Sequence, residues 1–288
     1  MRWTVRTASL ALACAAPAQA HAAAILFSSS GPNAAAVRPT VDSFRTALGA
    51  LNPNVAGSFG SGRREINWDG VPDAFAGNDS ALPLNFFNAN SPRGAVFSTP
   101  GTKVIVSENG VPGPVRFGEI DPNFSSQFAT FSPQKLFGVI GGNIVDTNFF
   151  VPGSNTPAYV TGFGAVFTDI DLANTTSIQF FDLAGNSLGA FFAPTGPTAA
   201  ESLSFLGVVF TAGERIGRVR ITSGTAGLNI CNVTGPGDCV AMDDFIYAEP
   251  QAVSAVPEPD TWAMLALGFG VIGAALRRRS PTGRPSLR

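Results

Sequence analysis

The amino-acid sequence predicts an all-β protein: an antiparallel, jelly-roll-like β-sandwich with one short helix near its N-terminus. Short segments rich in β-branched and aromatic residues recur along the chain, each bounded by glycine, proline or asparagine. The 32 glycines and 22 prolines among 288 residues leave little room for long helices. The 24 phenylalanines supply apolar area for a core. No internal repeat is visible, which disfavours a propeller or a solenoid.

A single helix is expected early in the chain. Pro39 suits the first turn of a helix, where a missing N–H costs no hydrogen bond. Val41, Phe44 and Leu48 follow at spacings of three and four, which places them on one helical face. Gly49 then stands where glycine commonly ends a helix, because it accepts a positive φ.

The strands are expected to run in short segments from residue 95 to residue 248. Two of them flank residues 184–187, whose glycine and asparagine favour a hairpin turn. No helical pattern separates the segments, so consecutive strands should pair antiparallel. The expected strands cover residues 95–98, 103–107, 136–140, 144–151, 160–168, 177–183, 188–193, 202–210, 215–222 and 240–248.

A polar segment at residues 63–73 carries too many charged groups for a plain strand, so we expect it at one end of the sandwich. It contains Arg-Glu-Ile-Asn-Trp-Asp-Gly at residues 64–70, and Asp-Asp-Phe occurs at residues 243–245. Together these motifs resemble a family of uncharacterised exported proteins. The resemblance implies export and a β-rich body but no activity.

Residues 1–20 are expected to be a signal peptide. Two arginines give a basic start, residues 7–16 form an apolar centre, and residues 18–20 supply the small side chains that a signal peptidase requires. A lipoprotein signal at Cys14 is the alternative. It is disfavoured because the chain lacks the usual aliphatic residue three places before that cysteine.

The C-terminal segment has three parts in a fixed order. Pro257, Glu258 and Pro259 open it, an apolar run follows, and the basic residues close it. This order resembles the PEP-CTERM sorting signal of exported proteins of Gram-negative bacteria, in the variant with Trp-Ala two residues after Pro-Glu-Pro. The resemblance implies that the basic cluster holds the tail in the inner membrane until an exosortase-type enzyme cuts near Pro-Glu-Pro. The basic cluster comprises Arg277, Arg278 and Arg279.

The apolar run is expected to form a short transmembrane helix before processing. Its fifteen residues span only ~22 Å at about 1.5 Å per residue, less than a hydrocarbon core of ~30 Å. A permanent membrane anchor is therefore the weaker alternative. The expected division is a body at 21–250, a linker at 251–256, the sorting segment at 257–280 and a basic tail at 281–288. The membrane segment includes Trp262, Leu265, Leu267, Phe269, Val271, Ile272 and Leu276.

The body is expected to contain one disulfide. Export removes Cys14 with the signal peptide and leaves Cys231 and Cys239, an even pair. Two glycines and one proline between them let the chain turn back, and an oxidising compartment would keep the bond closed. Two free buried thiols are the alternative.

Two acidic clusters are candidate calcium sites, because carboxylate oxygens are the ligands that Ca²⁺ prefers. Asp69 and Asp73 form the first, near Glu65; Asp243 and Asp244 form the second, which Asp169 and Asp171 could join in space. No EF-hand spacing is present. In the alternative, the first pair caps turns and one of the second pair binds an arginine.

Trp68 has two interpretations. It could stack on a sugar in a binding groove, but an aromatic residue in such a protein more often lies in the core.

Charge and residue types exclude several functions. The body, residues 21–256, carries 11 basic and 18 acidic residues, a net charge of about −7, so nucleic acid is not an expected partner. His21 is the single histidine, which disfavours a Ser-His-Asp triad and excludes a histidine-rich zinc site. We therefore expect a non-enzymatic surface or matrix module associated with exopolysaccharide or biofilm. The alternatives are a secreted glycoside hydrolase using Glu65 and Asp69, and an ice-binding or adhesion protein.

Overall fold

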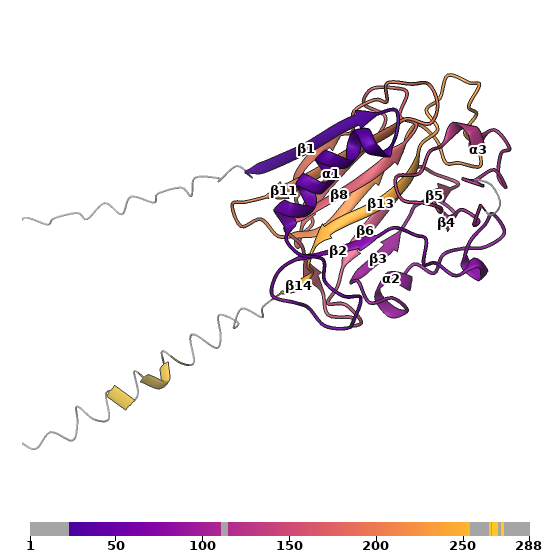
Figure 1. The fold of residues 1–288 in the computed structure, drawn as a ribbon. Coiled ribbons are helices and arrows are strands. Elements are labelled where there is room, and N and C mark those ends of the chain that lie inside the picture. Colours follow the sequence, from indigo (N-terminus) through magenta and orange to yellow (C-terminus); the bar gives the residue numbers. More distant parts are fainter. Residues whose placement is uncertain (1–22, 111–114, 254–264, 266, 270–271, 274–288) are drawn as a thin grey trace, which may run out of the picture. The chain divides into compact units, whose positions relative to one another are not determined.

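A computed structural model describes residues 23–110, 115–253, 265, 267–269 and 272–273 of the chain. The chain divides into two units, Met1–Ala252 and Val253–Arg288. The first unit holds the sheets shown in Figure 1. The predicted signal peptide, Pro257 to Pro259, the three arginines and most of the apolar run lie outside the described residues. Within the described part of the chain, no helix is long and apolar enough to cross a membrane.

Two antiparallel sheets make up most of the described fold. Strand β14 (Gln251–Ala252) pairs with β7 (Ala158–Tyr159) in a separate, two-stranded sheet. Strand β14 belongs to the segment that was expected to be a linker. The five-stranded sheet has the order β10 (Ser187–Phe192), β9 (Ser177–Asp182), β12 (Ile216–Thr222), β6 (Ile144–Phe149) and β3 (Ala95–Ser98). The larger sheet has the order β1 (Ala24–Gly31), β11 (Leu203–Phe210), β8 (Gly162–Thr168), β13 (Ala241–Ala248), β5 (Phe137–Ile140) and β4 (Lys103–Val106), with β2 (Arg63–Ile66) beside β13.

The sheets are wound as a jelly roll, as the sequence predicts. Consider the strands β5, β6, β8, β9, β10, β11, β12 and β13 in chain order. The first strand of this series, β5, pairs with the last, β13. Moving inward from both ends of the series, β6 pairs with β12, β8 with β11 and β9 with β10. All these pairs are antiparallel. This is the path of a long two-stranded ribbon folded over into two sheets.

Phenylalanine side chains fill the space between the two sheets. Phe149 on β6 lies 6.3 Å from Phe163 on β8, measured between ring centroids. Phe97 on β3 lies 5.3 Å from Phe137 on β5. Trp68 stacks on Phe137 at 4.1 Å and is only 1% exposed. The core interpretation of Trp68 is therefore confirmed, and the sugar-stacking alternative is wrong.

Helix α1 spans Ala34–Leu48 and covers the end of the large sheet near β1 and β11 (Figure 1). Its N-cap is Asn33, whose side-chain oxygen accepts a hydrogen bond from the N–H of Ala36 at 3.2 Å. Val41, Phe44 and Leu48 are buried, as predicted. The prediction that the helix ends at Gly49 is also confirmed, and this glycine has φ +98°. The prediction for Pro39 is wrong, because Asn33 starts the helix earlier and leaves Pro39 inside it.

Close packing of α1 on the sheet requires a glycine beneath it. The Phe44 ring contacts the rings of Phe27 and Phe205, each at 5.4 Å. A Cβ atom on Gly207 would come within 2.8 Å of the Phe44 ring. A side chain at this strand position would therefore lift the helix from the sheet.

Four strands, β1, β2, β7 and β14, were not predicted, and three short helical segments connect the strands. Strand β1 was missed, and β2 corrects the expectation that residues 63–66 are too polar for a strand, because Arg64 and Ile66 are fully buried there. The other predicted strands are observed with ends shifted by at most two residues. The short segments are η1 (Asp73–Phe75), α2 (Phe86–Ala89) and α3 (Phe124–Gln127).

The predicted disulfide joins Cys231 to Cys239. Cys239 is buried in a small second core together with Phe117, Phe124 and Leu228. The bond closes a short loop, which in the chain-entropy view constrains the unfolded state by about 2 to 3 kcal/mol. The bond therefore fixes the loop at residues 231–239 to this small core.

An ion pair is enclosed where β2 meets the end of β13. Arg64 donates to Glu249 from Nε at 2.6 Å and from Nη2 at 2.9 Å, and both side chains are at most 1% exposed. Arg64 also donates to the carbonyls of Pro53, Pro92 and Gly57. Every nitrogen of the guanidinium thus has an oxygen partner, as a buried charge requires.

We predict that Glu249→Gln lowers the free energy of unfolding by about 3 to 5 kcal/mol, because it leaves the Arg64 guanidinium buried without a counter-ion. Urea unfolding measures this loss. The matched control is Glu201→Gln, which removes the 2.7 Å ion pair with Arg116 at a side chain that is 55% exposed. The control should change stability by less than about 1 kcal/mol. Equal effects of the two variants would contradict the prediction.

Candidate functional site

A bulge in the central strand positions Asp243 and Asp244. The pairing of β13 with β8 shifts register between Met242 and Phe245. On the other side of β13, β5 pairs at Met242 and β2 pairs from Phe245 onward. The two aspartates therefore face a gap between β5 and β2, where the strand has no continuous neighbour.

The loop at residues 131–135 fills this gap and binds both aspartates. Asp243 accepts hydrogen bonds from the N–H groups of Phe131 at 2.6 Å and Ser132 at 3.3 Å. The Ser132 hydroxyl donates to Asp244 at 2.7 Å. The carboxylates of the second predicted acidic cluster thus accept hydrogen bonds from other residues of the chain.

The first predicted acidic cluster binds the other end of the same loop. Asp69 accepts hydrogen bonds from the N–H groups of Gln134 and Lys135, the latter at 2.9 Å. Asp73 accepts from the Lys135 ammonium at 2.8 Å. All four aspartates expected to hold calcium therefore hold loop 131–135. Within the described residues, no group of three or more carboxylate, histidine or cysteine side chains is placed to bind a metal ion; calcium binding stays a prediction.

Asp169 and Asp171 do not join Asp243 and Asp244. The N–H of Asp171 donates instead to Asp238 at 2.9 Å, and Asp169 accepts from Gln127. Burial raises the pKa of Asp169 to about 7, and repulsion from Asp171 and Asp238 adds to this effect. These acids form a separate cluster at the end of β8.

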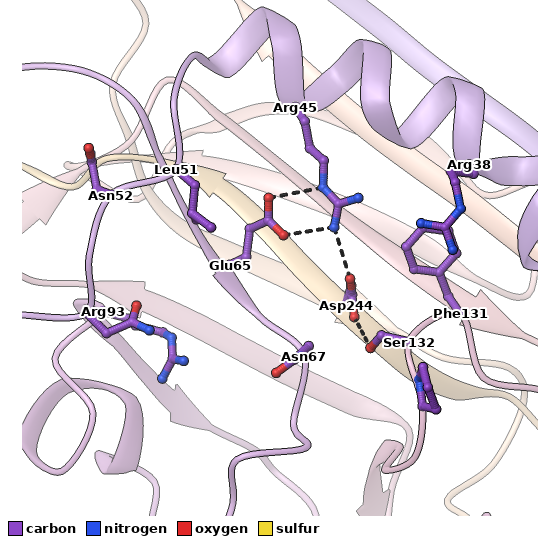
Figure 2. A pocket seen from close by; sticks show the side chains of 12 residues that line it. Arg38, Arg45, Leu51, Asn52, Glu65, Asn67, Arg93, Phe131, Ser132 and Asp244 are labelled. Atoms are coloured by element: carbon purple, nitrogen blue, oxygen red, sulfur yellow. Dashed lines mark hydrogen bonds and ion pairs between the residues drawn. The ribbon is translucent and has the colours of Figure 1, made fainter.

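Arg45 on α1 links Glu65 and Asp244, as Figure 2 shows. Its Nη2 donates to Glu65 at 2.8 Å and to Asp244 at 3.3 Å, and its Nε donates to Glu65 at 3.0 Å. Glu65 also pairs with Arg63 at 2.6 Å. The expectation that one aspartate of the second cluster binds an arginine is confirmed.

A pocket of about 440 Å³ opens beside this network, between α1, β2 and loop 131–135. Figure 2 shows Arg45 reaching from the helix towards the two carboxylates, with Arg38 against the Phe131 ring. The walls combine charged groups, amides and one aromatic ring, a set that binds polar ligands. The lining residues are Arg38, Arg45, Leu51, Asn52, Asn54, Glu65, Asn67, Arg93, Phe131, Ser132, Pro133 and Asp244.

Burial affects the protonation of the two adjacent aspartates, of which Asp244 lines the pocket. It raises the pKa of Asp243 well above its ordinary value, and repulsion from Asp244 adds to the rise. Burial also raises the pKa of Asp244, although hydrogen bonding from Ser132 and attraction to Arg45 oppose it. The pair therefore holds a proton more readily than free aspartates do, which reduces the negative charge facing the pocket.

The arginines of this pocket were not predicted from the sequence. Arg38, Asp42 and Arg45 recur at spacings of four and three, so they share one face of α1. This spacing could have indicated a polar helix face. Arg93 and Ser132 have no such local pattern, and only the fold brings them to the pocket.

Comparison with protein families identifies the C-terminal segment. Residues 255–279 match the PEP-CTERM protein-sorting motif. The chain is thus an exported protein sorted by exosortase, directed to the cell envelope or surface of a Gram-negative bacterium. Comparisons with curated proteins and with solved structures found no match.

We predict that Asp169→Asn stabilises the protein at pH 8 but not near pH 4. An unfolded aspartate has a pKa near 3.9, while that of the folded Asp169 is about 7. The folded chain therefore binds more protons than the unfolded chain between these values, and stability falls as the pH rises through them. Removing the ionisable group should raise the melting temperature at pH 8, and the gain should vanish towards pH 4.

Asp182→Asn is the control, for which we expect a change in stability in the opposite direction. A hydrogen bond from Asn186 lowers the pKa of Asp182, so the ionised form stabilises the fold above pH 4. This variant should lose stability at pH 8. An unchanged pH dependence of melting in Asp169→Asn would contradict the prediction.

Proposed function

We propose that this exported, exosortase-sorted protein is a non-enzymatic module that binds polysaccharide at the cell surface or in a biofilm matrix. The observation that carries the proposal is the open pocket between α1 and loop 131–135. Its amides and guanidinium groups match the hydroxyl and acidic groups of sugars, and Leu51, which is 56% exposed, provides an apolar wall. Rigid strands and a hydrogen-bonded loop fix these groups in place before a ligand arrives.

A glycosidase fits the geometry less well. Glu65 and Asp244 both face the pocket, and a pair of carboxylates is what such an enzyme needs. However, one nitrogen of Arg45 contacts both carboxylates and occupies the space where the sugar's reacting carbon would have to lie. Asp244 is also bound by Ser132 and is 3% exposed in its side chain. The arrangement supports a binding site in preference to a hydrolytic one.

Calcium remains part of the proposal only as a structural ion. Asp69, Asp73, Asp243 and Asp244 are hard oxygen donors in an acidic body. They do not enter the proposed binding reaction.

We predict that the full chain, purified in a neutral detergent, binds polysaccharides on a glycan array. Asn67→Ala removes an exposed amide of the pocket and should weaken binding about fivefold, the value of one hydrogen bond. Asn90→Ala removes an exposed amide outside the pocket and should leave binding unchanged. A folded protein that binds no glycan, or that hydrolyses one in a Glu65-dependent manner, would overturn the proposal.

A second prediction concerns processing in the native host. Mature protein should end between Val256 and Pro259, because the sorting motif addresses the chain to a cleaving enzyme. Intact-mass analysis of surface protein measures the end. Neutral residues in place of Arg277 to Arg279 should reduce retention before cleavage, since three guanidinium groups resist crossing the membrane. Surface protein that keeps Trp262 to Leu276 would indicate a permanent anchor.

A further inference from the structure

We infer that the ligand of the pocket is an anionic polysaccharide whose carboxylate groups bind Arg38 and Arg93. This inference rests on the proposed function and specifies its substrate class. It depends on the balance of charge in the pocket, on the surroundings of the two arginines and on their separation.

The acids of the pocket are already neutralised by partners within the protein. Glu65 accepts from Arg45 and Arg63, and Asp244 accepts from Arg45 and Ser132. Arg45 is thus fully engaged with protein carboxylates. These acids present little unpaired negative charge to an incoming anion.

The other two arginines of the pocket have no such partner. Within the described part of the chain, neither Arg38 nor Arg93 forms an ion pair. Glu65 and Asp244 are the acidic side chains that line the pocket, and both bind Arg45. The pocket therefore holds two positive charges that the protein does not neutralise there.

Arg93 is the stronger indication of an anion. Its Nη1 donates to the Ser91 hydroxyl, while its Nε is buried and has no hydrogen-bond partner among the residues that the structure describes. The guanidinium lies over the Phe87 ring at 5.1 Å. Burial lowers its pKa, and repulsion from Arg64 acts in the same direction. An arginine desolvated in this way gains most from a bound carboxylate, whose two oxygens match the guanidinium fork.

Arg38 lies on the opposite side of the pocket. Its guanidinium stacks on the Phe131 ring at 4.9 Å, and the side chain is exposed. In Figure 2, Glu65, Asn67 and Asp244 lie between Arg38 and Arg93. A polymer that repeats a carboxylate along its chain could reach both, with its sugar rings over the amide of Asn67.

The net charge of the whole body affects how an anionic polysaccharide can bind. A net charge of about −7 repels polyanions from the protein as a whole. Binding of an acidic polysaccharide must therefore come from a specific positive region. Arg38 and Arg93 form such a region within the pocket.

The test measures binding of the full chain, in neutral detergent, to polygalacturonate. Methyl-esterified polygalacturonate is the matched neutral ligand, with dextran and dextran sulfate as further probes. We expect binding to polygalacturonate and at least about tenfold weaker binding to its ester, the equivalent of one lost charge-assisted hydrogen bond. Binding should weaken as salt concentration rises.

Two variants assign the effect to the arginines. Arg38→Gln and Arg93→Gln should each weaken polygalacturonate binding about tenfold. Arg215→Gln is the control: Arg215 is also exposed and stacks on an aromatic ring, that of Tyr159 at 4.8 Å, but it lies outside the pocket. Melting temperatures check the fold of each variant. Arg38 is exposed and forms no ion pair with any residue in the described ranges, so Arg38→Gln should fold and can test the inference even if Arg93→Gln unfolds.

The outcomes separate this inference from the proposed function. Equal binding of polygalacturonate and its ester, unchanged in Arg38→Gln, would overturn the anionic assignment and leave the polysaccharide module intact. Preference for dextran sulfate, or an equal loss in Arg215→Gln, would indicate general charge attraction and would also overturn the assignment. A folded chain that binds none of the four polymers would overturn both.

Discussion

A guanidinium and a carboxylate, those of Arg64 and Glu249, are enclosed together where β2 meets the end of β13. Removing either from water without the other would be costly, so the pair fixes the register of these two strands. Successive side chains of a strand point to opposite sides. With Arg64 turned inward, its neighbour Glu65 faces the pocket and meets Arg45. The buried pair thus determines the position of the network on the other side of the strand.

Loop 131–135 supplies the hydrogen-bond donors for four acidic side chains. Four aspartates from three segments accept hydrogen bonds from backbone N–H groups, a hydroxyl and an ammonium in five consecutive residues. The two buried carboxylates, those of Asp243 and Asp244, thereby gain donors. In return the loop has a fixed path, and its residues Phe131 and Ser132 form a rigid wall of the pocket.

Local sequence predicted most strands, because β-branched and aromatic residues between turn signals need no distant partner to be identified. It failed for β2, where burial of a charged residue depends on Glu249, 185 residues away. It failed for β1 because serines dominate its second half. The pocket was only partly predictable, since Arg45 and Asp244 are 199 residues apart. The sorting signal could be predicted because it is a linear motif near one end of the chain, and such a motif is recognised without knowledge of the fold.

The winding of the jelly roll also sets an order of events during synthesis of the chain. Strand β13 lies between β8 on one side and β5 and β2 on the other, yet it is the last strand of the sandwich to be synthesised. The large sheet can close only after residue 248 has been added. The sorting motif begins at residue 255. The sheet therefore becomes complete only a few residues before the sorting motif, and the fold and the motif depend on the same late part of the chain.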